Sequence, residues 1–127
     1  MIRTGIDILK IERIKEKIEN QSFYNNCFTD YERQYALNKQ CKTDENKKYQ
    51  TLAGIFSGKE ALLKAIGSGV KNLNYLKQIE ITHEASGRPV VNVWGEVGDI
   101  IKSLNCSTID ISISHDGEYA VAVCVLN

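Results

Sequence analysis

Apolar and polar side chains alternate along the first strand-length segment of the chain. Residues 2–9 read IRTGIDIL, which places Ile6 and Ile8 on one face of an extended segment and Gly5 and Asp7 on the other. A period of two predicts a β-strand. The carboxylate of Asp7 is therefore expected on a strand, between two isoleucines of the sequence.

From residue 10 onward the hydrophobic period becomes that of a helix. Three isoleucines recur on one side, namely Ile11, Ile14 and Ile18. A second side carries only basic residues, namely Lys10, Arg13 and Lys17, and the acidic residues lie on a third side. A charged helix face is usually only solvated, but this separation of the two signs also suits docking to an acidic protein partner.

Two further helices are predicted in the first half of the chain. Thr29 precedes Glu32 by the spacing of a capping box, so a helix is expected to begin there. Residues 38–48 are polar and aperiodic, which predicts an exposed loop. Apolar residues then recur at helical spacing over residues 49–66. Gly54 and Gly58 weaken this helix, and their small size permits close packing.

The second half of the chain favours β-strands. We expect strands at 78–82, 90–94, 108–114 and 119–126, a turn at 86–89 and a short helix at 95–104. Asp116 and Gly117 separate the last two strands and predict a tight hairpin. This order of elements predicts one α+β domain, residues 1–127, with a largely antiparallel sheet packed with about three to four helices.

Composition narrows the possible functions. The 127 residues include 16 basic and 16 acidic side chains, so net charge does not steer the chain towards nucleic acid or an anionic membrane. No apolar run approaches the roughly 20 residues that span a bilayer, and the N-terminus lacks a signal peptide's apolar segment, so we expect a cytoplasmic protein. The four cysteines form no CxxC pair, which argues against a zinc or redox motif.

The segment KEALLKAIGSG, residues 59–69, combines charged residues with a glycine-rich end. Glu60 and Lys64 have the spacing of an ordinary surface ion pair, and Ser57 and Glu60 have that of a capping box. A third interpretation adds Asp7. Carboxylates from two separate elements can hold a hard divalent cation that also binds phosphate oxygens, while lysines neutralise the remaining charge.

Gly67 and His115 each have two interpretations. Gly67, followed by Ser68 and Gly69, is either a plain helix C-cap or the start of a backbone segment that approaches a phosphate. His115 lies where a strand leads into a turn, and it is either a turn histidine bonded to backbone or a group for phosphate binding or proton transfer. His83 has a similar position without a motif around it and is expected to be structural.

Four separated segments together resemble the holo-acyl-carrier-protein synthases, the small bacterial 4'-phosphopantetheinyl transferases. They are GIDI at 5–8 followed by Arg13, KEALLKAIGSG at 59–69, GRP at 87–89 and SISHD at 112–116. The resemblance implies the 4'-phosphopantetheinyl transferase-like fold and a Mg²⁺-dependent reaction of fatty acid biosynthesis. In it, 4'-phosphopantetheine passes from coenzyme A to a serine of apo acyl carrier protein and adenosine 3',5'-bisphosphate is released. The resemblance also implies a homotrimer with sites between subunits.

Position by position, the resemblance assigns roles to individual residues. Asp7 and Glu60 would bind Mg²⁺, and Lys64 would offset charge on the diphosphate. The surroundings of coenzyme A would comprise Lys59, Lys64, Gly67, Ser68, Arg88, Pro89 and His115. The basic face formed by Lys10, Arg13 and Lys17 would dock the acidic helix of the carrier protein. Either a carboxylate or a metal-bound water would deprotonate the attacking serine.

One position departs from the family pattern. The family commonly has arginine where this chain has Ile55, so a phosphate contact is either missing or supplied by the Lys47–Lys48 segment.

Two other functions would use the same candidate residues, Asp7, Glu60 and the lysines. A metal-dependent phosphodiesterase or nuclease is disfavoured by the zero net charge and the lack of a tight acidic cluster. A non-enzymatic module that binds coenzyme A or a nucleotide would need only the lysines and the glycine-rich segment.

Overall fold

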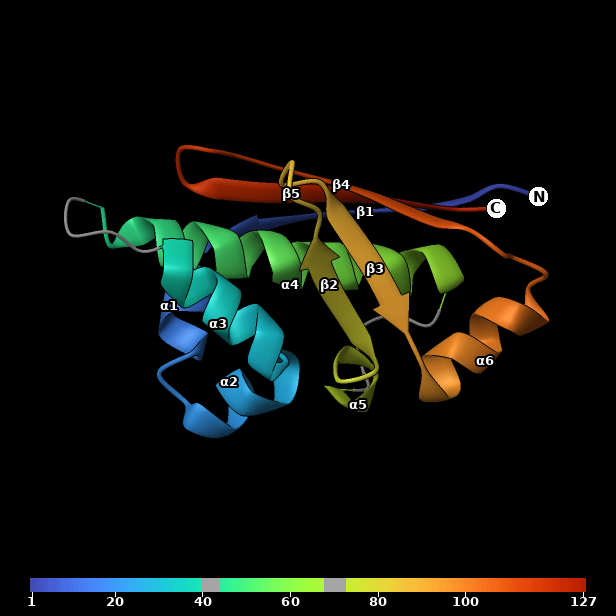
Figure 1. Cartoon of the computed structure of the whole chain (residues 1–127), viewed down its shortest axis with the longest axis horizontal. Helices are drawn as coiled ribbons and strands as arrows, with labels where there is room; N and C mark the ends of the chain where they lie inside the picture. Colours follow the sequence, from blue (N-terminus) through green and yellow to red (C-terminus); the bar gives the residue numbers. More distant parts are fainter. Residues whose placement is uncertain (40–43, 68–72) are drawn as a thin grey trace.

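The chain starts with a strand and continues into helices, as the change of hydrophobic period predicts. The computed structural model describes residues 1–39, 44–67 and 73–127. The first half contains β1 (Arg3–Lys10), α1 (Ile11–Lys17), α2 (Gln21–Cys27), α3 (Asp30–Lys39) and α4 (Asn46–Ile66). The second half contains α5 (Leu73–Leu76), β2 (Ile79–His83), β3 (Pro89–Val93), α6 (Gly95–Ser103), β4 (Ile109–Asp116) and β5 (Tyr119–Leu126) (Figure 1).

All the strands pair antiparallel. β1, β5 and β4 form a three-stranded sheet with β5 in the middle, and β2 pairs with β3 in a separate two-stranded sheet. The predicted α+β class and antiparallel pairing are confirmed, although the strands are divided between two sheets. The described residues form six helices, more than the three to four predicted, because α2 and the short α5 were not foreseen.

The long helix α4 lies between the three-stranded sheet and a second layer that contains α1, α3 and β2 (Figure 1). Glycines set its distance from the sheet. A Cβ atom built on Gly5 of β1 would lie 1.9 Å from the carbonyl oxygen of Ala61 in α4. A Cβ on Gly58 would lie 2.7 Å from side-chain atoms of both Ile111 and Ile81. The prediction that small residues in this helix permit close packing is confirmed.

The two faces of β1 have different environments. Gly5 and Asp7 are buried on the face towards α4. Ile6 and Ile8 point the other way and are 62% and 65% exposed, and Val123, the register partner of Ile6 on β5, is 37% exposed. The isoleucines of the alternating segment therefore form an apolar outer face of the sheet, and the buried face carries the carboxylate.

A local sequence signal located the start of α3, but not every predicted helix end is confirmed. Thr29 and Glu32 form the predicted capping box, in which the Glu32 N–H donates to Thr29 Oγ1 over 3.2 Å and the Thr29 N–H donates to Glu32 Oε1 over 2.9 Å. α3 ends at Lys39 and α4 begins at Asn46, so both ends of the loop predicted at 38–48 are helical, while residues 40–43 lie outside the described residues. Ser57 lies inside α4, and the alternative in which it caps a helix with Glu60 is wrong.

β4 and β5 form the expected hairpin, with Gly117 at a φ of 58° in the turn. Cys27, Cys106 and Cys124 are free and buried, and Cys41 lies outside the described residues. Within the three described ranges, no helix is both long and apolar enough to cross a membrane.

Candidate active site

β1 and α4 bring together the residues Asp7, Glu60 and Lys64. The Asp7 side chain is 10% exposed, and its Oδ1 lies 3.2 Å from Nζ of Lys64, which is 48% exposed. The contact depends on the tight packing at Gly5, because Asp7 is two residues farther along the same face of β1. Glu60 precedes Ala61, the residue whose carbonyl oxygen faces Gly5. The two predicted carboxylates thus come from neighbouring elements.

Glu60 titrates in an unusual range. Its pKa is raised from 4.5 to about 7, chiefly by burial and then by the nearby negative charge of Asp7, while Lys17 and Lys64 act in the opposite direction. A carboxylate held this way is only partly ionised near neutral pH. Placing positive charge next to the pair would favour the ionised form of Glu60.

The donor set fits a hard divalent cation. Asp7 and Glu60 supply two carboxylates from separate elements, and Mg²⁺ is commonly bound by one or two protein carboxylates. Within the described ranges, no group of three or more His, Cys, Asp or Glu side chains could hold a metal. A cation at Asp7 and Glu60 would take its other ligands from water and from phosphate oxygens of a substrate.

Two of the three basic-face residues have contacts that the sequence did not predict. Lys17 Nζ lies 5.6 Å from the ring centroid of Phe23 and 5.5 Å from that of Phe56, and its charge lowers the pKa of Glu60. Lys10 Nζ lies 5.9 Å from the ring of Tyr119. Both residues and Arg13 are exposed. Lys17 therefore adds positive charge to the carboxylate pair while it remains at the surface.

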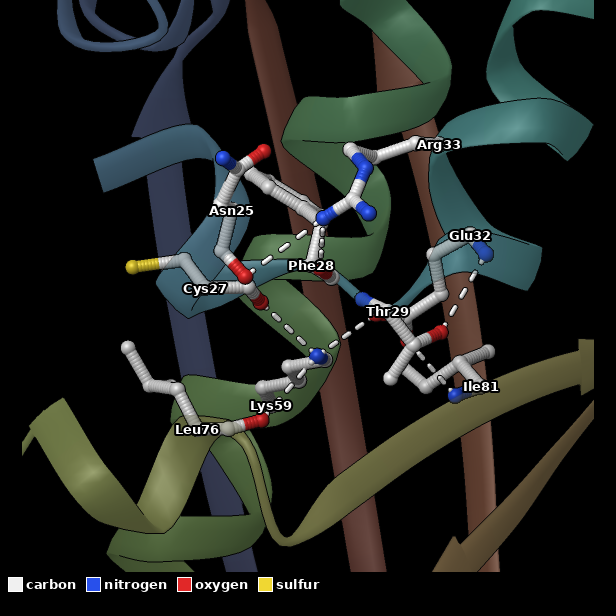
Figure 2. A network of polar contacts seen from close by, with 9 residues as sticks. All are labelled: Asn25, Cys27, Phe28, Thr29, Glu32, Arg33, Lys59, Leu76 and Ile81. Carbon is white, nitrogen blue, oxygen red and sulfur yellow. Dashed lines mark hydrogen bonds and ion pairs between the residues drawn. The ribbon is translucent and has the colours of Figure 1, made fainter. Parts of the chain in front are cut away.

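Lys59 does not have the position expected of a coenzyme A contact. Its side chain is fully buried, and Nζ donates to Glu32 Oε1 over 2.6 Å, to the Cys27 carbonyl over 2.8 Å and to the Leu76 carbonyl over 3.1 Å (Figure 2). These bonds use all three N–H groups of the ammonium. The prediction of a direct contact is corrected to a buried ion pair. Because Glu32 lies 27 residues away in sequence, no local pattern could have indicated it.

Gly67 ends α4 as a C-cap. Its φ of 85° is left-handed, and its N–H donates to the carbonyl oxygens of Leu63 and Lys64, both over 3.1 Å. This amide is therefore already engaged at the helix end, which favours the C-cap interpretation of Gly67 over a phosphate contact by its N–H. Ser68, the next predicted residue, lies outside the described residues.

A cavity of about 350 Å³ lies towards the N-terminal half of α4. It is lined by residues that include the predicted Pro89 and His115 and also Tyr35, Lys39, Lys47 and Ile55. Ile55 is about five residues before Glu60, or roughly 8 Å along the helix axis. Arg88 does not line the cavity and instead pairs with Asp110 over 2.8 Å and with Glu84 over 3.7 Å.

One wall of this cavity is aromatic. The ring of His83 stacks on that of Tyr35 with centroids 3.8 Å apart, and Lys39 Nζ lies 5.1 Å from the Tyr35 ring. Burial lowers the pKa of His83, and the charge of Lys39 lowers it further. No sequence motif marks these three residues as a group, because α3 and the end of β2 meet only in the folded chain.

Residues 3–124 match the family model of the 4'-phosphopantetheinyl transferase superfamily. The chain belongs to this superfamily. Among similar members is the holo-[acyl-carrier-protein] synthase of Halothermothrix orenii, 36% identical over 128 residues that cover 98% of this chain and 97% of the relative. The enzyme of that name from Alkaliphilus oremlandii is 40% identical over 119 residues, which cover 93% of this chain and 92% of the relative.

Solved structures of superfamily members have the same fold. The Helicobacter pylori holo-[acyl-carrier-protein] synthase in complex with coenzyme A matches with a TM-score of 0.79 and 27% identity, covering all of both chains. The Chronobacterium ammoniagenes ACPS–CoA complex matches with a TM-score of 0.81 and 27% identity, covering 100% of this chain and 97% of the other. The transferase-like fold expected from the four motifs is confirmed.

Proposed function

We propose that this chain is a holo-acyl-carrier-protein synthase, which transfers 4'-phosphopantetheine from coenzyme A to a serine hydroxyl of apo acyl carrier protein. Relatives with this name match nearly the whole chain. The observation that carries the proposal is the meeting of β1 and α4, which sets Asp7 and Glu60 beside Lys64. Such a site suits a substrate with a charged diphosphate. The reaction would supply fatty acid biosynthesis with its active carrier.

The reaction breaks the phosphoanhydride bond of the coenzyme A diphosphate and forms a phosphodiester bond to serine. The serine oxygen attacks the phosphorus that carries pantetheine and loses its proton to a carboxylate or to a water molecule of the site. The bond from that phosphorus to the bridging oxygen breaks, and adenosine 3',5'-bisphosphate leaves with the negative charge. Because charge on the diphosphate grows as this bond breaks, fixed positive groups lower the barrier. Lys64 is placed to supply one of these groups, and Lys17 is near enough to Glu60 to add a second.

Mg²⁺ dependence is part of the proposal, with Asp7 and Glu60 as the protein ligands. A bound divalent cation supplies positive charge that neutralises and polarises the diphosphate oxygens. The raised pKa of Glu60 supports this assignment, because burial and the charge of Asp7 both disfavour the ionised carboxylate, and a cation beside it would offset both effects. Lys64 remains bonded to Asp7 Oδ1 and so orients that carboxylate.

The cavity beside α4 is the proposed place for the nucleotide end of coenzyme A. It includes Pro89 and His115 from the family motifs and the cationic side chains of Lys39 and Lys47. Ile55, which replaces the common family arginine, lines the same cavity as Lys47. Lys47 is therefore the proposed replacement for the missing phosphate contact, as the sequence suggested.

Two surfaces support the proposed partners. Arg13 and Lys10 are exposed on the same basic face as Lys17, whose charge acts on Glu60, and they would complement the acidic helix of a carrier protein. The apolar outer face of the three-stranded sheet, with Ile6 and Ile8 more than 60% exposed, supports the proposed homotrimer, because large exposed apolar patches commonly mark protein interfaces. The cytoplasmic location expected from the sequence stays a prediction.

A mass measurement tests the proposed function. The purified chain is incubated with Mg²⁺, coenzyme A and apo acyl carrier protein, and the intact mass of the carrier is followed. The carrier is expected to gain one 4'-phosphopantetheine. A carrier of unchanged mass, with coenzyme A bound to the chain, would instead select the non-enzymatic binding module.

A further inference from the structure

A buried ion pair lies directly beside the carboxylate site. Lys59 and Glu32 are both fully buried and point toward each other (Figure 2). Lys59 is next to Glu60 in the sequence of α4. Glu32 Oε1 accepts from Lys59 Nζ over 2.6 Å and from the Thr29 N–H over 2.9 Å, while Oε2 accepts from the Ile81 N–H over 2.7 Å. Both oxygens of the Glu32 carboxylate and the Lys59 ammonium therefore have hydrogen-bond partners within the protein.

The pair joins five elements at one point. Through Glu32 it links the start of α3 to β2, and through Lys59 it links α4 to the Cys27 carbonyl at the end of α2 and to the Leu76 carbonyl at the end of α5. Arg33 extends the network, because its Nη1 donates to the Phe28 carbonyl over 2.7 Å and holds the chain just after α2 (Figure 2). The acceptors of the Lys59 ammonium on α2, α3 and α5 are thus tied to one another and to α4 through this one side chain.

Small residues of α4 face the sheet near Glu60. Near Glu60 the sheet-facing positions are Gly58, Ala61 and Ala65, whose small side chains set the distance between helix and sheet. Such positions set how closely the helix approaches the sheet, whereas hydrogen bonds are directional and also restrict rotation of the helix about its own axis. A rotation of α4 would carry Glu60 away from Asp7. The bonds of Lys59 act one residue from Glu60 and oppose this rotation.

We propose that Glu32 and Lys59 are positioning residues for Glu60, which they hold at the angle that a divalent cation shared with Asp7 requires. The proposal rests on the proposed function, since it concerns the same carboxylate pair. A buried ion pair is weak support for stability, because apolar residues of similar volume often replace both partners without loss. Its directional bonds restrict geometry, and outer groups that orient metal ligands typically alter metal affinity or activity by about 10- to 100-fold.

The test uses variants that separate positioning from folding. In the double variant Glu32→Gln, Lys59→Met both charges are removed together, so no charge is left buried without a partner. Glu32→Asp keeps the charge and shortens the side chain by one methylene. Val97→Ala, in the buried face of α6, is the control that lowers stability without touching the network. For each variant we would measure Tm, Mn²⁺ binding by electron paramagnetic resonance, and kcat and KM for the carrier protein.

The proposal predicts that both network variants lose about 10- to 100-fold in Mn²⁺ affinity and in kcat, with KM for the carrier unchanged. Val97→Ala is expected to lower Tm and leave Mn²⁺ affinity within about twofold of wild type. Wild-type Mn²⁺ affinity in a folded double variant would overturn the positioning role alone. If the double variant does not fold, Glu32→Asp decides in the same way. A wild-type chain that transfers phosphopantetheine without any response to metal would overturn the metal assignment and this proposal together.

Discussion

Replacing Gly5 by alanine is expected to disrupt the candidate active site without touching any of its charged groups. The added Cβ would lie 1.9 Å from the Ala61 carbonyl oxygen and 2.6 Å from the Ala65 nitrogen, whereas real Cβ atoms essentially never approach closer than 3.0 Å. Both obstructing atoms are backbone, so no side chain can rotate away. β1 and α4 must separate by about 1 Å, and Asp7 moves away from Glu60 and Lys64 with its strand.

The size of the effect follows from the same contact. Overpacking a well-packed core costs about 1–3 kcal/mol, and a clash with backbone belongs at the upper end. A loss of about 3 kcal/mol lowers the Tm by roughly 10 °C for a chain of this length. Misplacing reacting groups by about 1 Å costs about 100-fold in rate, so kcat is expected to fall by that factor at a temperature where the variant is still folded.

Gly98→Ala provides the matched control. Gly98 lies in α6, and the nearest atoms to an added Cβ are those of Val93 at 4.0 Å. This change is expected to leave kcat unaltered and to raise the free energy of unfolding by about 0.5–1 kcal/mol, because alanine favours a helix. Thermal denaturation and initial rates of carrier modification measure both variants. A Gly5→Ala protein with wild-type Tm and kcat would refute the view that this contact sets the site.

Three further predictions concern single charged residues. In chelator-treated buffer, the raised pKa of Glu60 makes ionisation unfavourable in the folded state, so wild-type stability should fall relative to Glu60→Gln as pH rises from about 4.5 to about 7. After allowance for the partial exposure of Glu60, we expect wild type to lose about 1–2 kcal/mol of unfolding free energy relative to Glu60→Gln by pH 8. A difference in urea midpoint between the two proteins that is the same at pH 5 and pH 8 would contradict this. Lys47→Ala should raise KM for coenzyme A about tenfold with kcat unchanged, whereas Lys102→Ala on α6 should alter neither constant. Arg13→Ala should raise KM for the carrier and flatten its dependence on salt, and an unchanged salt dependence would remove Arg13 from the docking face.

Much of the fold could be predicted because its signals are local. The Thr29–Glu32 spacing located the start of α3, and Asp116 and Gly117 located the final hairpin. α2 could not be foreseen, because the sequence QSFYNNC has no clear helical period. Its start is set by Asn20, whose side chain accepts from the Phe23 N–H over 3.1 Å. A single capping residue is a weak signal in a sequence.

Sequence patterns predicted only part of the candidate site. Asp7 and Glu60 were correctly expected to come from separate elements that meet, because each motif marks its own element. The second role of Glu32 was hidden, since its capping-box spacing already explained the residue and its partner Lys59 is distant in sequence. The exposure of Ile6 and Ile8 was equally hidden, because alternation identifies the two faces of a strand and does not say which is buried.

The central claim is that Asp7 and Glu60 make this chain a metal-dependent phosphopantetheinyl transferase. The most direct measurement follows the intact mass of apo acyl carrier protein with coenzyme A, with and without Mg²⁺, for wild type and Glu60→Gln at equal folded concentration. Wild type should add one 4'-phosphopantetheine only with Mg²⁺, and Glu60→Gln should add none in either condition. Transfer by Glu60→Gln at the wild-type rate, or an unmodified carrier after incubation with wild type and Mg²⁺, would contradict the claim.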